Sequence, residues 1–136
     1  MAKIIQDIWI IASSGIVVFE RVFDEKLSPQ LFGMLLKALD SMAGEISKGG
    51  LTNFELKQKR FSIIKKKEFM FIANSSRKTK VERLMDELQF ITEKFVEIYP
   101  QSVLDNWNNN INVFSGFLNE IDKSVEEKVK GFLKRI

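Results

Sequence analysis

The side chains that most often carry out acid–base and metal chemistry are missing or badly placed in this sequence. Its 136 residues include no histidine and no cysteine, which removes the commonest general base, the commonest metal ligand and any disulfide. The carboxylate pairs Asp86-Glu87 and Glu126-Glu127 are neighbours on predicted helices, where consecutive side chains point apart. We therefore expect no catalytic centre and no cofactor.

Two other stretches could bind ions, and both depart from the patterns that such sites need. Asp105 and the asparagines that follow it offer oxygen ligands, but the stretch lacks the glycine and the final glutamate of a calcium-binding loop. Gly49-Gly50 lacks the lysine and the preceding strand of a phosphate-binding loop. The sequence thus predicts neither a metal site nor a nucleotide site.

Charge is unevenly distributed along the chain. Residues 57–83 carry ten basic and two acidic side chains, a net charge of +8, whereas the whole chain carries only +3. Such an imbalance favours contact with phosphates, lipid headgroups or an acidic partner. The candidate anionic surface consists of Lys65, Lys66, Lys67, Arg77, Lys78 and Lys80. The same charges could simply be solvated, or protect sheet edges from aggregation. The aromatic residues nearby are predicted to belong to strand cores, which argues against a nucleic-acid surface.

The element that organises the chain is a hairpin over residues 3–23, with a turn at Ser13-Ser14-Gly15. Its first strand is apolar on both sides, with Ile4, Ile8 and Ile10 on one and Ile5, Trp9 and Ile11 on the other. A strand buried on both faces belongs at the centre of a sheet that has layers on each side. Asp7 is the exception in this strand and needs a partner.

The elements after the hairpin follow from caps and periodicity. Ser28-Pro29 begins a helix over 29–47, whose apolar stripe contains Leu31, Leu35, Leu39, Met42 and Ile46 and is broadened by Phe32, Leu36 and Ala43. Strands are expected over 51–57, 60–66 and 69–74, the last beside the first strand of the hairpin, and a second helix over 78–98. Trp107 either plugs the edge of the core or forms an exposed binding aromatic.

The final segment has apolar residues spaced three and four apart from Ile111 to Ile136, which predicts a helix too long for a domain of this size to cover. We expect a domain over residues 1–122 and a helical extension over 123–136. Val125, Val129 and Phe132 on this extension would either contact a partner or fold back on the domain.

This order of elements, with a five-stranded antiparallel sheet between one helix and two others, resembles the longin domain. The resemblance covers about residues 3–121 and rests on IQDIWII, the Ser-Gly turn, the Ser-Pro helix start, GGLTNFEL and FMFIANSS. The chain is most similar to short stand-alone longin-like proteins of archaea, which are related to eukaryotic trafficking subunits. The resemblance implies an α+β, three-layer α/β/α longin-like (profilin-like) fold.

The resemblance also implies a non-enzymatic adaptor of the vesicle-trafficking type. Longin domains bind small GTPases, SNARE segments or each other, so we expect a dimer, or a complex with a small GTPase or another longin- or roadblock-type subunit. The chain shows neither a SNARE motif nor a membrane anchor, which argues against a fusogenic role.

Three surfaces are candidates for partner binding: the first-helix face, the C-terminal helix and an open sheet edge. The edge residues are Arg21, Phe23, Asn53, Glu55 and Lys57. The alternative function is a peripheral membrane module that binds anionic headgroups through residues 57–83. No leader and no apolar run of spanning length is seen, so a cytoplasmic location is expected.

Overall fold

A computed structural model of the protein describes residues 4–22, 28–100, 103–104, 107 and 111–117. These residues form an antiparallel five-stranded sheet in the order β2-β1-β5-β4-β3. The strands are β1 (Asp7–Ala12), β2 (Val17–Arg21), β3 (Asn53–Glu55), β4 (Lys59–Lys66) and β5 (Phe69–Ser76). The helices are α1 (Pro29–Ile46), α2 (Val81–Ile98) and the 3-10 helix η1 (Ile111–Phe114).

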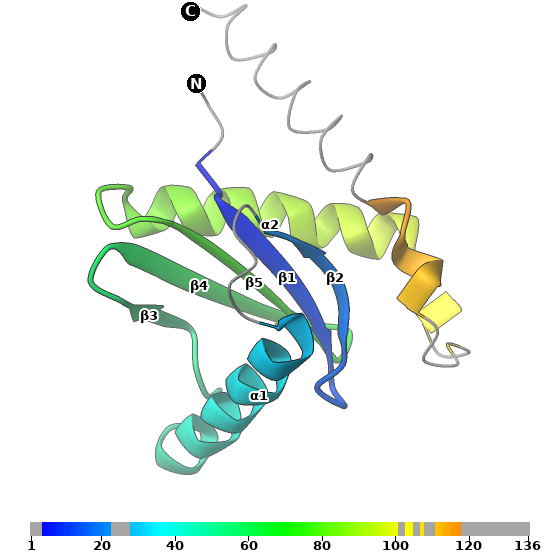
Figure 1. The fold of residues 1–136 in the computed structure, drawn as a ribbon, viewed down its shortest axis with the longest axis horizontal. Helices are drawn as coiled ribbons and strands as arrows, with labels where there is room; N and C mark the ends of the chain where they lie inside the picture. Colours follow the sequence, from blue (N-terminus) through cyan, green and yellow to red (C-terminus); the bar gives the residue numbers. More distant parts are fainter. Residues whose placement is uncertain (1–3, 23–27, 101–102, 105–106, 108–110, 118–136) are drawn as a thin grey trace, which may run out of the picture.

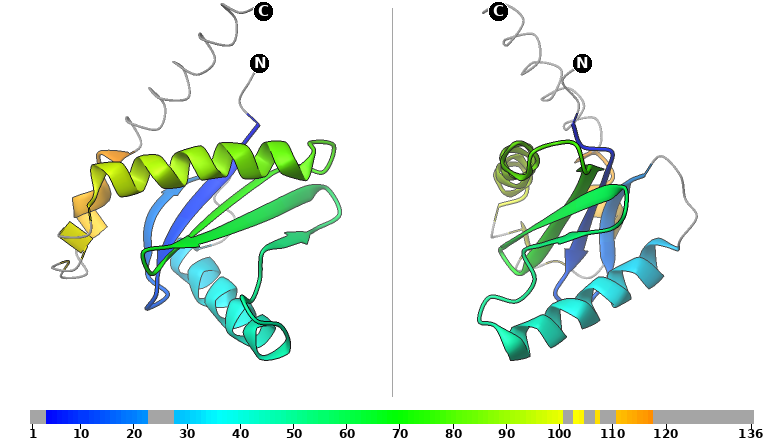
Figure 2. Two further views of the ribbon diagram at one scale, coloured as in Figure 1. Left: turned by 180° about the vertical axis from the view of Figure 1, so that it is seen from behind. Right: turned by 90° about the vertical axis from the view of Figure 1, so that its left-hand side faces the viewer.

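The sheet lies between the two long helices, with α1 on one face and α2 on the other (Figures 1 and 2). This arrangement confirms the predicted α+β fold and five-stranded antiparallel sheet. The third helix was expected from Ile111 onward, but residues 111–114 form a 3-10 helix. Residues 118–136, and with them most of that prediction, lie outside the described part of the chain.

The two central strands are β1 and β5, as their apolar sequences predict. All six residues of β1 are buried, and β1 pairs with β5 along its whole length, from Asp7 opposite Asn74 to Ala12 opposite Phe69. Asp7 obtains the partner that its burial requires: its backbone N–H donates to Asn74 Oδ1 (2.9 Å), and Asn74 Nδ2 donates to Asp7 Oδ2 (3.0 Å). A buried carboxylate is tolerated because it is hydrogen-bonded.

The larger core fills the space between α2 and the sheet. Leu84, Leu88, Ile91 and Phe95 of α2 are at most 1% exposed, and they pack against apolar side chains of the central strands and of the segment after α2. Trp107 belongs to this cluster: its ring centroid lies 6.0 Å from that of Phe69. The prediction that Trp107 plugs the edge of the core is confirmed.

The second core lies between α1 and the opposite face of the sheet. It contains Trp9, Ile11, Val17, Leu36, Phe61, Ile63, Met70 and Ile72. Helix α1 approaches the β1–β2 hairpin at Gly33, where an added Cβ would lie 2.7 Å from Val17 Cγ2 and 2.8 Å from Gly15 O. Both distances are well inside van der Waals contact, so the closeness of α1 to the sheet depends on this glycine.

Most of the stripe predicted for α1 does not face the core, although two of the residues predicted to broaden it, Phe32 and Leu36, do pack there. Only Gly33 and Leu36 are buried in this helix, while four members of the predicted stripe, Leu31, Leu35, Met42 and Ile46, are more than half exposed. The helix carries apolar residues around much of its circumference, so periodicity alone cannot select the packed side. The close approach at Gly33 fixes the rotation of the helix and turns the stripe outward.

Candidate protein-interaction surfaces

The exposed side of α1 carries a continuous apolar stripe, which we call the α1 face. Its large side chains, with their exposed fractions, are Leu31 (56%), Met34 (65%), Leu35 (51%), Met42 (59%) and Ile46 (83%). At 3.6 residues per turn, these positions share one side of the helix and extend about 22 Å along it. Contiguous apolar surface of this kind marks interaction sites on soluble domains.

The N-terminal end of α1 is fixed to the edge of the sheet by a side-chain amide. Val17 N–H donates to Gln30 Oε1 (3.0 Å), and Gln30 Nε2 donates to Val17 O (3.1 Å). The amide therefore bonds to Val17 as a neighbouring strand would. It closes the outer edge of β2 at this residue.

A carboxylate holds the C-terminal half of α1. Asp40 forms an ion pair with Lys65 of β4 and accepts a hydrogen bond from Leu51 N–H (2.9 Å). Burial raises the pKa of the Asp40 carboxyl, but the hydrogen bonds from Lys65 and Leu51 and the positive charge of Lys65 outweigh this effect, so the pKa lies below its ordinary value. The contacts connect α1, the loop after it and β4.

The outer edge of β3 is open in the described part of the chain, since β3 is the last strand of the sheet on that side. Leu56 N–H donates to Lys59 O and Ile63 N–H donates to Thr52 O, so the backbone groups of residues 52, 54 and 56 face β4. Alternation along an antiparallel strand then directs the N–H and C=O groups of Asn53 and Glu55 outward. This edge can accept another strand.

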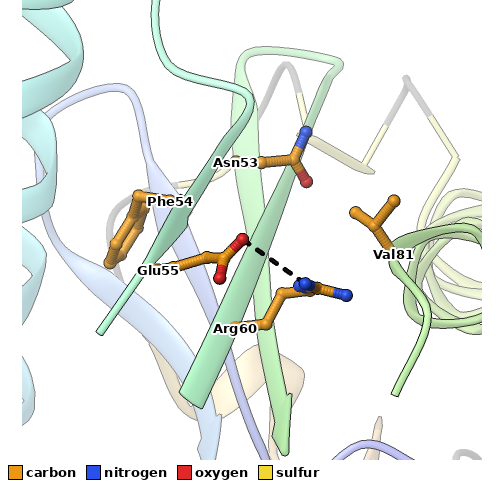
Figure 3. Close-up of a pocket in the computed structure, with 5 residues that line it drawn as sticks. All are labelled: Asn53, Phe54, Glu55, Arg60 and Val81. Atoms are coloured by element: carbon orange, nitrogen blue, oxygen red, sulfur yellow. Dashed lines mark hydrogen bonds and ion pairs between the residues drawn. The ribbon is translucent and has the colours of Figure 1, made fainter. Parts of the chain in front are cut away.

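A hollow of ≈ 420 Å³ lies beside this edge, on the α2 side of the sheet, and is lined by Asn53, Phe54, Glu55, Arg60 and Val81. Figure 3 shows Asn53, Glu55 and Arg60 on the side of Val81, whereas Phe54 points to the other side of β3. Glu55 is paired with Arg60 (3.4 Å) and, outside the hollow's lining, with Arg77 (2.7 Å). The hollow therefore combines charged and polar side chains with apolar surface, including that of Val81.

The predicted anionic surface is divided between the two ends of the sheet. Lys65, Lys66 and Lys67 lie before β5, at the β4–β5 turn, and Arg77, Lys78 and Lys80 follow the last residue of β5. Eight residues of extended strand separate the groups, about 26 Å at the usual rise. The structure therefore does not bring these six residues together, and Lys65 is already paired with Asp40.

The predicted partner residues are likewise distributed over separate places. Arg21 ends β2 and Asn53 and Glu55 belong to β3, so both predicted strands are the edges of the sheet. Lys57 is exposed just after β3. Phe23, Val125, Val129 and Phe132, like the proposed boundary at residue 122, lie outside the described residues.

Other kinds of site find little support in the described ranges. No cluster of three or more carboxylate, histidine or cysteine side chains there could hold a metal ion. None of the helices described has the length and apolar character needed to cross a membrane.

Sequence reasoning missed two features of these surfaces. Gln30 gave no signal of its role, because its contact with Val17 depends on how α1 meets the hairpin. The predicted stripe did not include Met34, which is 65% exposed and belongs to the α1 face. The available signal was the width of the apolar surface of α1, which exceeds what one packed face needs.

Comparison with protein families adds to this geometry. Residues 6–117 match the family described as the first longin domain of FUZ, MON1 and HPS1. The chain belongs to this longin family. The match confirms the resemblance to the longin domain and covers most of the described residues. A search of curated proteins found no match.

Solved structures show the same fold in distant proteins. The longin chain is similar to a roadblock/LC7 domain from Streptomyces avermitilis, with a TM-score of 0.57 and 16% identity over 71% of this chain and 85% of that one. It is also similar to Myxococcus xanthus MglB, with a TM-score of 0.52 and 12% identity over 71% and 86%. The TM-scores show that this chain shares its fold with these two proteins, and at identities this low the similarity shows the fold alone.

Proposed function

We propose that this longin chain is a non-enzymatic interaction module that pairs with a second longin- or roadblock-type domain through the α1 face, and that the simplest such partner is a second copy of itself. One observation carries the proposal: five large apolar side chains on α1 are more than half exposed. Water contact with this much apolar surface is unfavourable, and pairing removes it.

The pattern on α1 suits a two-fold pair of helices. A two-fold interface must be self-complementary, so that residue i contacts residue j and j contacts i. If two α1 helices cross antiparallel at Ala38, which is exposed and small, Met34 of each lies opposite Met42 of the other. Leu31 then lies opposite Glu45 and next to Ile46 of the other helix, so the apolar side chains meet at the centre of the stripe and a carboxylate lies at each end.

The size of the effect is consistent with reversible association. Full burial of a Leu, Ile or Met side chain is worth roughly 1.5–3 kcal/mol, and these residues already have part of their surface covered. Ten such side chains, five from each copy, could therefore contribute roughly 10 kcal/mol, from which the cost of association must be subtracted. We expect a dimer that dissociates on dilution.

The experiment is light scattering across a concentration series. The full chain is expected to increase in mass with concentration, and the double variant Met34→Glu/Met42→Glu is expected to remain a monomer because each dimer would bury four carboxylates. Gln89→Glu, on the exposed side of α2, is the matched control and should dimerise normally. A truncation after Asp122 distinguishes the α1 face from the C-terminal extension, since loss of the dimer in that truncation alone would refute the α1 proposal.

We further propose a trafficking-type adaptor in the cytoplasm that engages small GTPases, as the resemblance to longin domains implies. The β3 edge and the α1 face are the surfaces available for such a partner. The membrane alternative has weaker support, because the basic residues form two separate groups and Lys65 is paired with Asp40. Binding to anionic vesicles that disappears with added salt would favour the membrane reading.

A further inference from the structure

The two edges of the sheet differ in whether their backbone groups are already used. At the β2 edge, the Gln30 amide bonds to both backbone groups of Val17, and η1 packs beside β2. At the β3 edge, the N–H and C=O groups of Asn53 and Glu55 point outward, and no strand of the described chain covers them. The fold thus occupies backbone groups of the β2 edge at Val17, whereas those of Asn53 and Glu55 on β3 are able to pair.

The side chains around the open edge are predominantly basic. The basic residues of the first two positions of β4, of the segments that follow β3 and β5, and of the first turn of α2 are Lys57, Lys59, Arg60, Arg77, Lys78, Lys80 and Arg83, of which Lys59 is paired with Asp7. The acidic residues in the same region are Glu55 and Glu82. Glu55 is already paired with two arginines, so the region has an excess of positive charge and favours an acidic partner.

The two sides of β3 offer different surroundings to an added strand. On the α2 side lies the hollow, where Asn53, Glu55 and Arg60 supply the polar groups and Val81 supplies apolar surface (Figure 3). On the α1 side, Phe54 stacks on Phe61 with ring centroids 4.5 Å apart, and Leu56 is 56% exposed. A strand laid along β3 would place alternate side chains over the hollow, beside Arg60, and over Phe54 and Leu56.

We propose that the β3 edge binds an extended peptide segment of a partner protein as a sixth strand of the sheet, with acidic side chains over the hollow and an apolar side chain beside Phe54. Residues of the peptide that pair with Asn53 and Glu55 have their side chains on the same face as these two, which is the face of Arg60. The recognised pattern is therefore acidic, apolar, acidic. Backbone hydrogen bonds hold the peptide and the alternate side chains select it.

The test uses fluorescence polarisation with a labelled synthetic peptide, acetyl-Thr-Glu-Ile-Glu-Val-Thr-amide, and its counterpart with lysine in place of both glutamates. We expect the glutamate peptide to bind at least tenfold more tightly. N-methylation of the two glutamates removes the N–H groups that would face β3 and should abolish binding. N-methylation of the isoleucine and the valine removes N–H groups on the outer side and should leave binding intact.

Variants of the protein locate the site. Asn53→Pro removes an outward N–H that the β3–β4 ladder does not use and should weaken peptide binding at least tenfold. Arg77→Glu/Lys80→Glu should also weaken binding, whereas Lys66→Glu/Lys67→Glu, with the same charge change at the other end of β5, should not. Circular dichroism of each variant establishes that it is folded.

Three results would overturn the proposal. The first is no binding at about 1 mM peptide, and the second is equal affinity for the glutamate and the lysine peptides. The third is an equal loss of affinity whether the glutamates or the isoleucine and valine are N-methylated. Binding of phosphatidylserine vesicles that depends on Arg77 and Lys80, without any discrimination between the peptides, would assign the basic residues to a membrane instead. Met34→Glu/Met42→Glu should retain peptide binding, so failure of the α1 proposal and failure of this one are distinguishable.

Discussion

Helices α1 and α2 have the same length and cover opposite faces of one sheet, yet they bury their apolar residues very differently. Each has 18 residues. Six residues of α2 are buried, and its exposed residues include Glu82, Arg83, Gln89 and Glu93. Only Gly33 and Leu36 of α1 are buried, and its exposed side carries five large apolar residues.

This difference shows on which face of the sheet the covering helix presents a polar outer side to water. Helix α2 covers its face of the sheet with its apolar side chains and presents a polar outer side, although Val103, Ile111 and Val113 of the segment after it are exposed. Helix α1 covers the opposite face with one side and leaves a second apolar side in water. The two helices should therefore respond in opposite ways to the same kind of substitution.

The largest expected effect is on the α2 side. Leu88 is fully buried, so Leu88→Ala should lower the free energy of unfolding by about 2–5 kcal/mol through lost burial and a cavity. Urea denaturation at low protein concentration measures it. A change below about 1 kcal/mol would mean that the α2 core is much looser than the structure shows.

Gly33 tests the attachment of α1. Gly33→Ala should destabilise by about 1–3 kcal/mol, because the new Cβ meets Val17 and Gly15 O at less than 3 Å. The control is Gly44→Ala in the same helix, where a Cβ meets nothing within 4 Å. There the better helix propensity of alanine should stabilise by roughly 0.5–1 kcal/mol. Stabilisation by both substitutions would show that α1 does not lie as close to the hairpin as described.

Asp40 tests the attachment of the C-terminal half of α1, and its effect on stability should depend on pH. Asp40→Asn removes the ion pair with Lys65 and should lower stability at neutral pH by about 1 kcal/mol. Because the pKa of Asp40 is lowered in the fold, its stabilisation is complete above the unfolded-state pKa of about 4 and is lost as the pH falls through the folded-state pKa. Unfolding curves of the two proteins should therefore converge at acidic pH, and a constant difference would contradict this role for the carboxylate.

The smallest effect on stability is expected on the exposed side of α1. Leu35 is 51% exposed, so Leu35→Ala should change the unfolding free energy of the dilute monomer by no more than about 0.5 kcal/mol. The same substitution should weaken self-association in sedimentation velocity. If Leu35→Ala instead destabilised the monomer as Leu88→Ala does, the two helices would not differ as proposed.

Much of the fold follows from local features of the sequence. The apolar faces of β1 predict its central position, Ser28-Pro29 and Gly49-Gly50 bound α1 within a residue or two, and the apolar start of β5 predicts its place beside β1. The side of α1 that packs could not be predicted, because both sides are apolar and the choice is made by a close contact between Gly33 and a hairpin 16 residues away in sequence.

The candidate surfaces were less predictable than the fold. Both edge strands could be named from their order, but only the structure shows that Gln30 occupies the backbone groups of Val17 on one of them. The basic segment looked like one surface because its residues are close in sequence. Strand β5 separates its two halves in space, and a composition count contains no information about that distance.

The most direct test of the central claim is NMR of methyl-labelled methionine, because the claim concerns two of the five methionines of the chain. At low concentration the methyl groups of Met34 and Met42 should be broadened by a soluble paramagnetic agent, while the buried Met70 should be unaffected. As concentration rises and the mass doubles, Met34 and Met42 should shift and become protected. If the mass doubles while both remain accessible, or if the chain remains a monomer throughout, the α1 face is not a self-association surface.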